Sequence, residues 1–124
     1  MNLLENLDIQ TQLVTASKCI ITVKVSDKLK QPYGIVHGGI NAVLAETAAS
    51  LGANQWLADH HQDQIALGVN LTTEHLIAVS SGYLKAVATP IKCGRQIQTW
   101  QTNIYCNQQQ TSTSIITLIN RPHP

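Results

Sequence analysis

The chain has 124 residues, which fits one domain spanning residues 1–124 and leaves no room for a second. Apolar residues make up 44% of it and phenylalanine is absent, so leucine, isoleucine, valine and alanine must build the core. Charged residues are only 12%, and the scattered lysines and arginines exclude the basic face that nucleic-acid binding requires.

The N-terminal segment predicts a short helix over residues 2–7 and no signal peptide. Residues 1–12 contain two acidic residues and no cationic stretch followed by an apolar run. No apolar run approaches the ~18 residues that are needed to cross a bilayer. The three cysteines have no metal-ligand spacing and are expected to be buried thiols in a reducing compartment. We therefore expect a cytoplasmic protein that does not interact with membranes.

A strand region and a loop follow. Residues 9–26 are rich in β-branched side chains with partial alternation, in which Ile21, Val23 and Val25 share one side. Residues 30–39 contain a proline and three glycines, which predict a loop with special backbone requirements.

One long helix is predicted from Gly39 to about Trp56. Its apolar stripe consists of Ile40, Val43, Leu44, Ala48 and Leu51. The other side carries small residues that permit close approach of another element, namely Ala42, Ala45, Ala49 and Ala53.

After a polar loop at 59–63, four strands are predicted at about 64–76, 82–91, 96–106 and 111–120. Strands around a single helix indicate an α+β protein with an antiparallel sheet, because parallel pairing would need a crossover for each strand. A sheet wrapped around the ~25 Å helix would cover its apolar stripe, which is the hotdog fold. The exposed sheet edges and the surface poor in charge both favour pairing in a dimer.

Residues that could act on a thioester are concentrated where the loop runs into the helix. The first N–H groups of a helix have no partner within it, so the Gly38 and Gly39 amides are candidates to bind an acyl oxygen. About two turns on, Glu46 is the only acidic residue between Asp27 and Asp59. If the adjacent alanine side meets another subunit, this carboxylate is partly removed from water, which favours a general base. The ordinary alternatives are a solvated glutamate and a glycine turn.

The segment from Gln31 to Glu46 resembles the signature of hotdog thioesterases of the 4-hydroxybenzoyl-CoA thioesterase type that carry a glutamate on the central helix. Within that type it is similar to the bacterial branch that acts on 1,4-dihydroxy-2-naphthoyl-CoA and on acyl-loaded aryl carrier protein. The match to Gln-Pro-aromatic-Gly-x-x-His-Gly-Gly-(x6)-Glu has no gaps, and a looser match covers about residues 28–105. The resemblance implies hydrolysis of an acyl-CoA, with an aromatic or naphthoyl group slightly favoured over a fatty one. It also implies no cofactor and a homodimer or homotetramer.

The resemblance also implies a role for each matching residue. Glu46 would be the nucleophile or general base, and the Gly38 amide with the Gln31 side chain would polarise the thioester carbonyl. His37 would lie near the sulfur, and Ser50 would position the water or the carboxylate. Glu46 would come from one subunit, and Gln31, His37 and Gly38 would come from its partner.

Two further segments correspond to coenzyme contacts in the family. They comprise Thr72, Thr73, Glu74 and His75 in one segment and Thr89, Pro90, Ile91, Lys92, Cys93 and Gly94 in the other, with Lys92 and Arg95 near phosphates. The chain departs from the family after His75, where relatives carry an arginine and this sequence has Leu76 and Ile77.

Other functions fit the sequence less well. The histidine pair at 60–61 lies between two aspartates but has no further spaced ligands, so we expect no metal site. A carrier protein in place of coenzyme A is an open alternative, as is a non-catalytic domain that binds acyl-CoA. A pure binding protein, however, has no need of a carboxylate facing a thioester. The Gly-Gly-(x6)-Glu spacing argues against a hotdog dehydratase.

Overall fold

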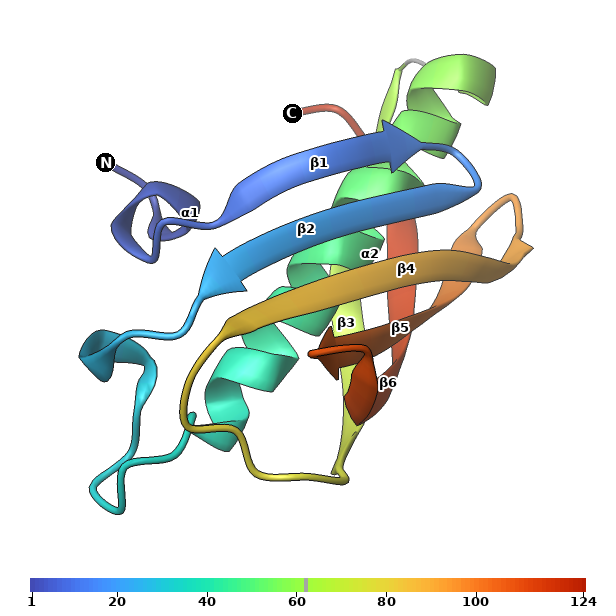
Figure 1. Cartoon of the computed structure of the whole chain (residues 1–124). Helices are drawn as coiled ribbons and strands as arrows, with labels where there is room; N and C mark the ends of the chain where they lie inside the picture. Colours follow the sequence, from blue (N-terminus) through green and yellow to red (C-terminus); the bar gives the residue numbers. More distant parts are fainter. Residues whose placement is uncertain (62) are drawn as a thin grey trace.

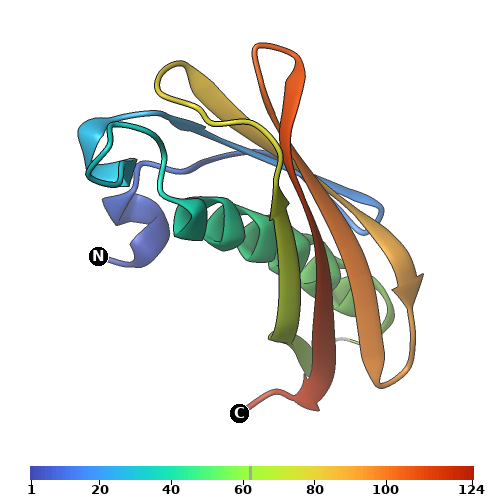
Figure 2. The same ribbon diagram turned by 90° about the horizontal axis from the view of Figure 1, so that it is seen from below.

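The computed structural model describes residues 1–61 and 63–124 and consists of one curved sheet and one long helix (Figure 1). The elements in chain order are α1 Leu3–Asn6, β1 Gln10–Thr15, β2 Lys18–Lys24, a 3-10 turn Asp27–Leu29, α2 Gly38–His60, β3 Gln64–His75, β4 Tyr83–Cys93, β5 Ile97–Cys106 and β6 Gln109–Pro122. The six strands form a single antiparallel sheet in the order β1-β2-β4-β5-β6-β3. Figure 2 shows α2 lying in the concave side of this sheet. The prediction of an α+β hotdog fold is confirmed.

The β-branched region at 9–26 forms a hairpin. Its turn is closed by the Thr15 hydroxyl oxygen, which accepts hydrogen bonds from the backbone N–H groups of Ser17 and Lys18 at 3.3 and 2.9 Å. The three residues that were predicted to share one side, Ile21, Val23 and Val25, are all buried.

Helix α2 begins one residue before its predicted start and continues four residues beyond its predicted end. The polar residues after Trp56 continue the helix because His60 packs back on the preceding turn. Its ring stacks on the Trp56 indole at 4.6 Å, and its Nδ1 lies 2.8 Å from the Trp56 carbonyl oxygen. The prediction of a loop beginning at Asp59 is therefore wrong for the last helical turn.

The buried face of α2 agrees only in part with the predicted one, because Leu44 and Ala48 are buried as expected and the rest of the stripe is not. The side chains fully covered by the sheet are four alanines and two leucines, namely Leu44, Ala45, Ala48, Ala49, Ala53 and Leu57. Ile40, Val43 and Leu51, expected in the covered stripe, are only half-buried. The cause is a close approach between helix and sheet, since a Cβ at Gly52 would lie 2.6 Å from the Trp100 ring. The alanine side, expected to be free for a second subunit, thus packs largely on the chain's own sheet.

A β-bulge in β3 decides which residues of this strand face the helix. Gly68 pairs with Leu118 and Asn70 with Thr117, so Val69 is an extra residue in β3. Because side chains alternate along a strand, this insertion moves Leu71 and His75 to the helix side and Thr72 to the outer side. The bulge therefore turns His75 toward the beginning of α2.

A buried polar network joins the helix to β5 and β6. The side-chain amide of Gln98 donates to the Ala53 carbonyl at 3.2 Å and to the Asn120 side-chain oxygen at 3.0 Å. The Gln98 oxygen accepts from the Trp100 indole N–H at 2.9 Å. Each polar atom of the Gln98 side chain is thus paired inside the core. Within residues 1–61 and 63–124, no helix is long and apolar enough to span a membrane.

Candidate active site

His37 caps the N-terminus of α2 and leaves one backbone amide available. Its Nδ1 accepts a hydrogen bond from the Gly39 N–H at 2.8 Å, which places the ring proton on the exposed Nε2. The Gly38 N–H donates to no group in residues 1–61 and 63–124. The expectation that both glycine amides bind an acyl oxygen is therefore corrected: Gly39 is engaged by the cap, and Gly38 remains free to act as a donor.

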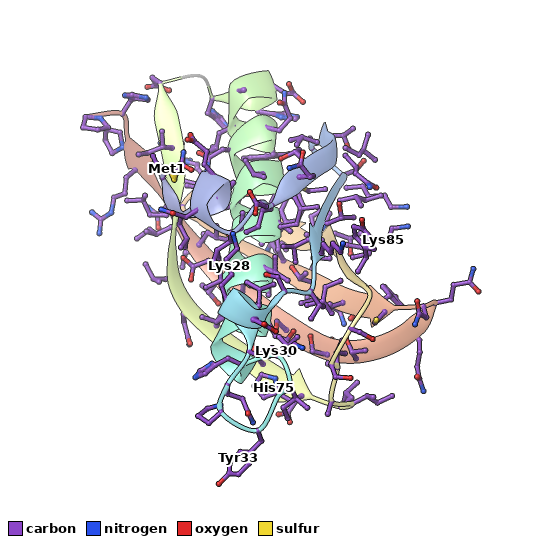
Figure 3. The ribbon with its side chains drawn as sticks, turned by 60° about the vertical axis from the view of Figure 1, so that its left-hand side comes forward. Met1, Lys28, Lys30, Tyr33, His75 and Lys85 are labelled. Atoms are coloured by element: carbon purple, nitrogen blue, oxygen red, sulfur yellow. The ribbon has the colours of Figure 1, made fainter. Side chains whose placement is uncertain are left out.

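A cleft of about 340 Å³ opens beside the Gly38 amide. Its lining is mostly aliphatic, with three polar side chains, and consists of Gln31, Ile35, Val36, Gly38, Asn41, His75, Leu76, Ile77, Ala78 and Val79. The Gln31 side-chain oxygen accepts from the Tyr33 backbone N–H, which leaves its NH₂ group as a donor. Tyr33 itself is 90% exposed and projects from the tip of the loop (Figure 3).

His75 lies against the beginning of α2, in the same cleft (Figure 3). A Cβ at Gly38 would stand 2.8 Å from the His75 Nε2, so only glycine leaves room for the imidazole. The Asn41 side-chain NH₂ donates to Nδ1 of His75 at 3.1 Å, which places the ring proton on Nε2. The sequence predicted His75 as a coenzyme contact but gave no role to Asn41. The available signal was a polar residue between apolar neighbours near the start of the helix.

Glu46 lies outside this cleft, on an exposed part of α2 that faces the bulge in β3. A Cβ at Gly68 would stand 3.0 Å from both Cδ and Oε2 of Glu46, so the carboxylate rests on the bare backbone of β3. Eight residues separate Glu46 from Gly38, which is about 12 Å along the helix axis. A thioester carbonyl must lie about 3 Å from both its donors and the attacking group. The backbone positions of the two groups on one helix are therefore farther apart than this distance.

Ser50 lies one turn after Glu46 and lines the same stretch of surface. Its hydroxyl oxygen is 3.4 Å from the side-chain NH₂ of Asn54, and Asn54 also bonds the Ala66 backbone of β3. This asparagine ties the helix to β3 next to Gly68, and thereby fixes the backbone on which the Glu46 carboxylate rests.

The two predicted coenzyme segments lie at opposite ends of the sheet. His75 pairs with Ser112, and the register continues through Ile104 to Ala86 on β4. Lys92 is six residues further along β4, roughly 20 Å away along the strands. One chain therefore does not bring the segments together.

The orientation of the other predicted contacts varies. By strand alternation, Thr72 and Glu74 point to the outer face, whereas Thr73 bonds the Ser114 hydroxyl at 2.8 Å. Pro90 is opposite the buried Trp100, and the Cys93 thiol, whose pKa is raised by burial, lies 3.5 Å from the Gln98 oxygen.

The remaining members of the β4 segment lie at its exposed end. Gly94 forms the tight turn into β5, where a Cβ would meet the Ile97 carbonyl oxygen at 2.6 Å. Thr89, Ile91, Lys92 and Arg95 are exposed. In the described part of the chain neither Lys92 nor Arg95 forms an ion pair, and no three His, Cys, Asp or Glu residues form a group that could hold a metal ion.

Comparison with known proteins gives consistent results. Residues 33–113 match the family model described as the thioesterase superfamily. The chain is 35% identical over 104 residues to the 1,4-dihydroxy-2-naphthoyl-CoA hydrolase of Listeria monocytogenes, covering 84% of this chain and 82% of that protein. It is also 35% identical over 101 residues to the proofreading thioesterase EntH of Cronobacter sakazakii, covering 77% and 72%. The crystal structure of a thioesterase from Haemophilus influenzae superposes with a TM-score of 0.89 at 32% identity, covering 96% of this chain and 82% of that one.

Proposed function

The chain belongs to the thioesterase superfamily and is a thioester hydrolase, and from that premise we propose that it hydrolyses an acyl-CoA with Glu46 as nucleophile or general base. We favour an aromatic or naphthoyl acyl group, because a relative with 35% identity is named a 1,4-dihydroxy-2-naphthoyl-CoA hydrolase. The reaction uses no cofactor, since the coenzyme A thioester is itself the substrate. Three free thiols support a cytoplasmic location.

The observation that carries this proposal is the pair of complementary groups on α2: a free Gly38 amide at its N-terminus and a carboxylate about 12 Å further along. Hydrolysis needs both the amide donor and the carboxylate at the same carbonyl. A second copy of the chain, pairing through the free edge of β3, would set Glu46 of one subunit against Gly38 of the other. Leu67 and Val69 beside this edge are 50% and 60% exposed, which supports its burial in a dimer. Two such dimers would form the homotetramer.

In the proposed mechanism the thioester carbonyl oxygen accepts hydrogen bonds from the Gly38 N–H and the Gln31 side-chain NH₂. Glu46 of the other subunit then attacks the carbonyl carbon or takes a proton from an attacking water, with Ser50 positioning that water or the carboxylate. The C–S bond breaks as the carbonyl re-forms, and the His37 Nε2–H stabilises the departing thiolate, which takes up a proton. Where water was the attacking group, this step releases the free acid. Where Glu46 was the attacking group, it leaves an acyl-Glu46 anhydride, which a water molecule then hydrolyses to the free acid and the restored carboxylate. The products are the free acid and coenzyme A. Lys92 and Arg95 are the exposed cations available for its phosphates.

The test is a panel of acyl-CoA thioesters, including a naphthoyl-CoA, assayed with the natural chain and with Glu46→Gln. The substitution keeps the size of the side chain and removes its charge. We expect kcat to fall by ~10² or more, the scale for losing a positioned base or nucleophile. Unchanged turnover would reject this role of Glu46. Tight binding of acyl-CoA without any hydrolysis by the natural chain would instead indicate a sensor.

A further inference from the structure

Two apolar hollows flank Glu46, away from the cleft at the N-terminus of α2. Each has a volume of about 230 Å³, and Glu46 and Thr47 line both. The first is completed by Leu3, Ala42, Val43 and Leu71, and the second by Leu4, Ser50 and Leu51. Glu46 therefore lies between two pieces of apolar surface, with only the hydroxyls of Thr47 and Ser50 as other polar side chains.

Helix α1 supplies one leucine to each hollow. This helix is only four residues long, but it is held at both ends. The Asn2 side-chain oxygen accepts from the Glu5 N–H at 3.0 Å, and Lys28 Nζ donates to the Asn6 carbonyl at 2.7 Å and the Asp8 carboxylate at 2.8 Å. Figure 2 shows α1 beside the first half of α2. The leucines of α1 are thus fixed next to the carboxylate.

The hollows suit the apolar part of a thioester. An apolar cavity of about 150 Å³ binds benzene, so each hollow has room for an aromatic ring or a short alkyl chain. Leu3 is 51% exposed in a position where it contributes little to the core, whereas Leu4 packs against the core. A leucine exposed beside the carboxylate offers apolar surface that an apolar acyl group would remove from water.

From these contacts we infer that α1 forms a wall of the acyl-binding subsite and that Leu3 limits the size of the acyl group. This inference rests on the proposed function, because it identifies the substrate that Glu46 attacks as a thioester with an apolar acyl group. The acyl chain or ring lies in the hollow between α1 and α2, with its carbonyl carbon next to the carboxylate. The helix that sets specificity is then outside the region that matches the family model, which begins at residue 33.

The experiment compares the full natural chain with Leu3→Trp and Leu3→Ala on acetyl-, butyryl-, hexanoyl-, octanoyl- and benzoyl-CoA. Tryptophan fills the hollow, so kcat/KM for hexanoyl and larger groups should fall about 10-fold or more relative to acetyl. Alanine enlarges the hollow and should shift the preference toward octanoyl. Leu13→Trp on β1 is the matched control, because Leu13 is 38% exposed and lines neither hollow.

If Leu3→Trp and Leu13→Trp show the same kcat/KM for the larger acyl groups relative to acetyl, the inference is overturned while the proposed function stays intact. If the natural chain hydrolyses no thioester, the proposed function fails. The acyl-binding subsite is then tested by calorimetry, which measures the affinities for two thioethers that cannot be hydrolysed, S-octyl-CoA and S-methyl-CoA. A selective loss of S-octyl-CoA affinity in Leu3→Trp supports the wall, and a parallel loss of both affinities overturns it.

Discussion

The position of the Glu46 carboxylate depends on residue 68 being a glycine, which has no side chain to displace it. Nothing in the sequence indicated this contact, because the two residues are 22 positions apart and the glycine lies in a strand whose register is set by β6. By contrast, the capping role of His37 and the free Gly38 amide follow from local geometry, so sequence could indicate them. Asn41 was missed because its partner His75 comes from a distant strand.

We predict that Gly68→Ala lowers kcat several-fold to about tenfold with little change in KM. The new Cβ would stand 3.0 Å from Cδ and Oε2 of Glu46 and displace them by a few tenths of an ångström, and misplacement by 1 Å can cost about 10²-fold. The measurement is steady-state kinetics in a double-mutant cycle with Glu46→Asp. The shorter aspartate withdraws the carboxylate from Gly68, so adding Gly68→Ala to it should have little further effect. Equal losses in both backgrounds would mean that Gly68 does not act through Glu46.

At the level of elements, the sequence predicts features that depend on neighbouring residues and misses features that depend on contacts between distant segments. The central helix and the four strands after it appear where periodicity placed them, within a few residues. The covered face of α2 was predicted correctly for Leu44 and Ala48 but not for the rest of the stripe. Hydrophobicity ranks leucine and isoleucine above alanine, whereas the close approach of Trp100 selects small side chains. The bulge at Val69 was not predictable from β-branched composition, since it exists only in the pairing with β6.

The buried Gln98 network is another feature that alternation alone could not reveal, and it yields a stability prediction. In Gln98→Ala, the Trp100 indole N–H and the Asn120 side-chain oxygen lose their partner in the core, while the Ala53 carbonyl keeps its bond within the helix. Each orphaned buried group costs about 1–3 kcal/mol, so the free energy of unfolding should fall by at least that amount. Urea denaturation checks this. Gln101→Ala is the control, because Gln101 is half-buried and makes one long hydrogen bond to Thr113 at 3.4 Å. A smaller loss of unfolding free energy in Gln98→Ala than in the control would contradict a stabilising role for the Gln98 network.

At the scale of the whole molecule, the chain holds two half-sites. The N-terminus of α2 offers donors in the cleft, and Glu46 offers a carboxylate about 12 Å away between two apolar hollows. The sequence motif contains all of these residues, but it does not give their separation, which follows from the rise of the helix. If Glu46 acts on a carbonyl held by Gly38, as proposed, this separation requires the two groups to come from two copies of the chain.

Complementation between two inactive variants tests this condition most directly. One variant is Glu46→Gln, and the other carries Gln31→Ala with His37→Ala. Mixed dimers of the two contain one site with every native group and one site in which Glu46, Gln31 and His37 are all replaced. After unfolding and refolding together at equal amounts, half the dimers are mixed, so activity should recover to about a quarter of the natural level. Activity no higher than the mean of the two separately refolded variants would contradict a site shared between subunits.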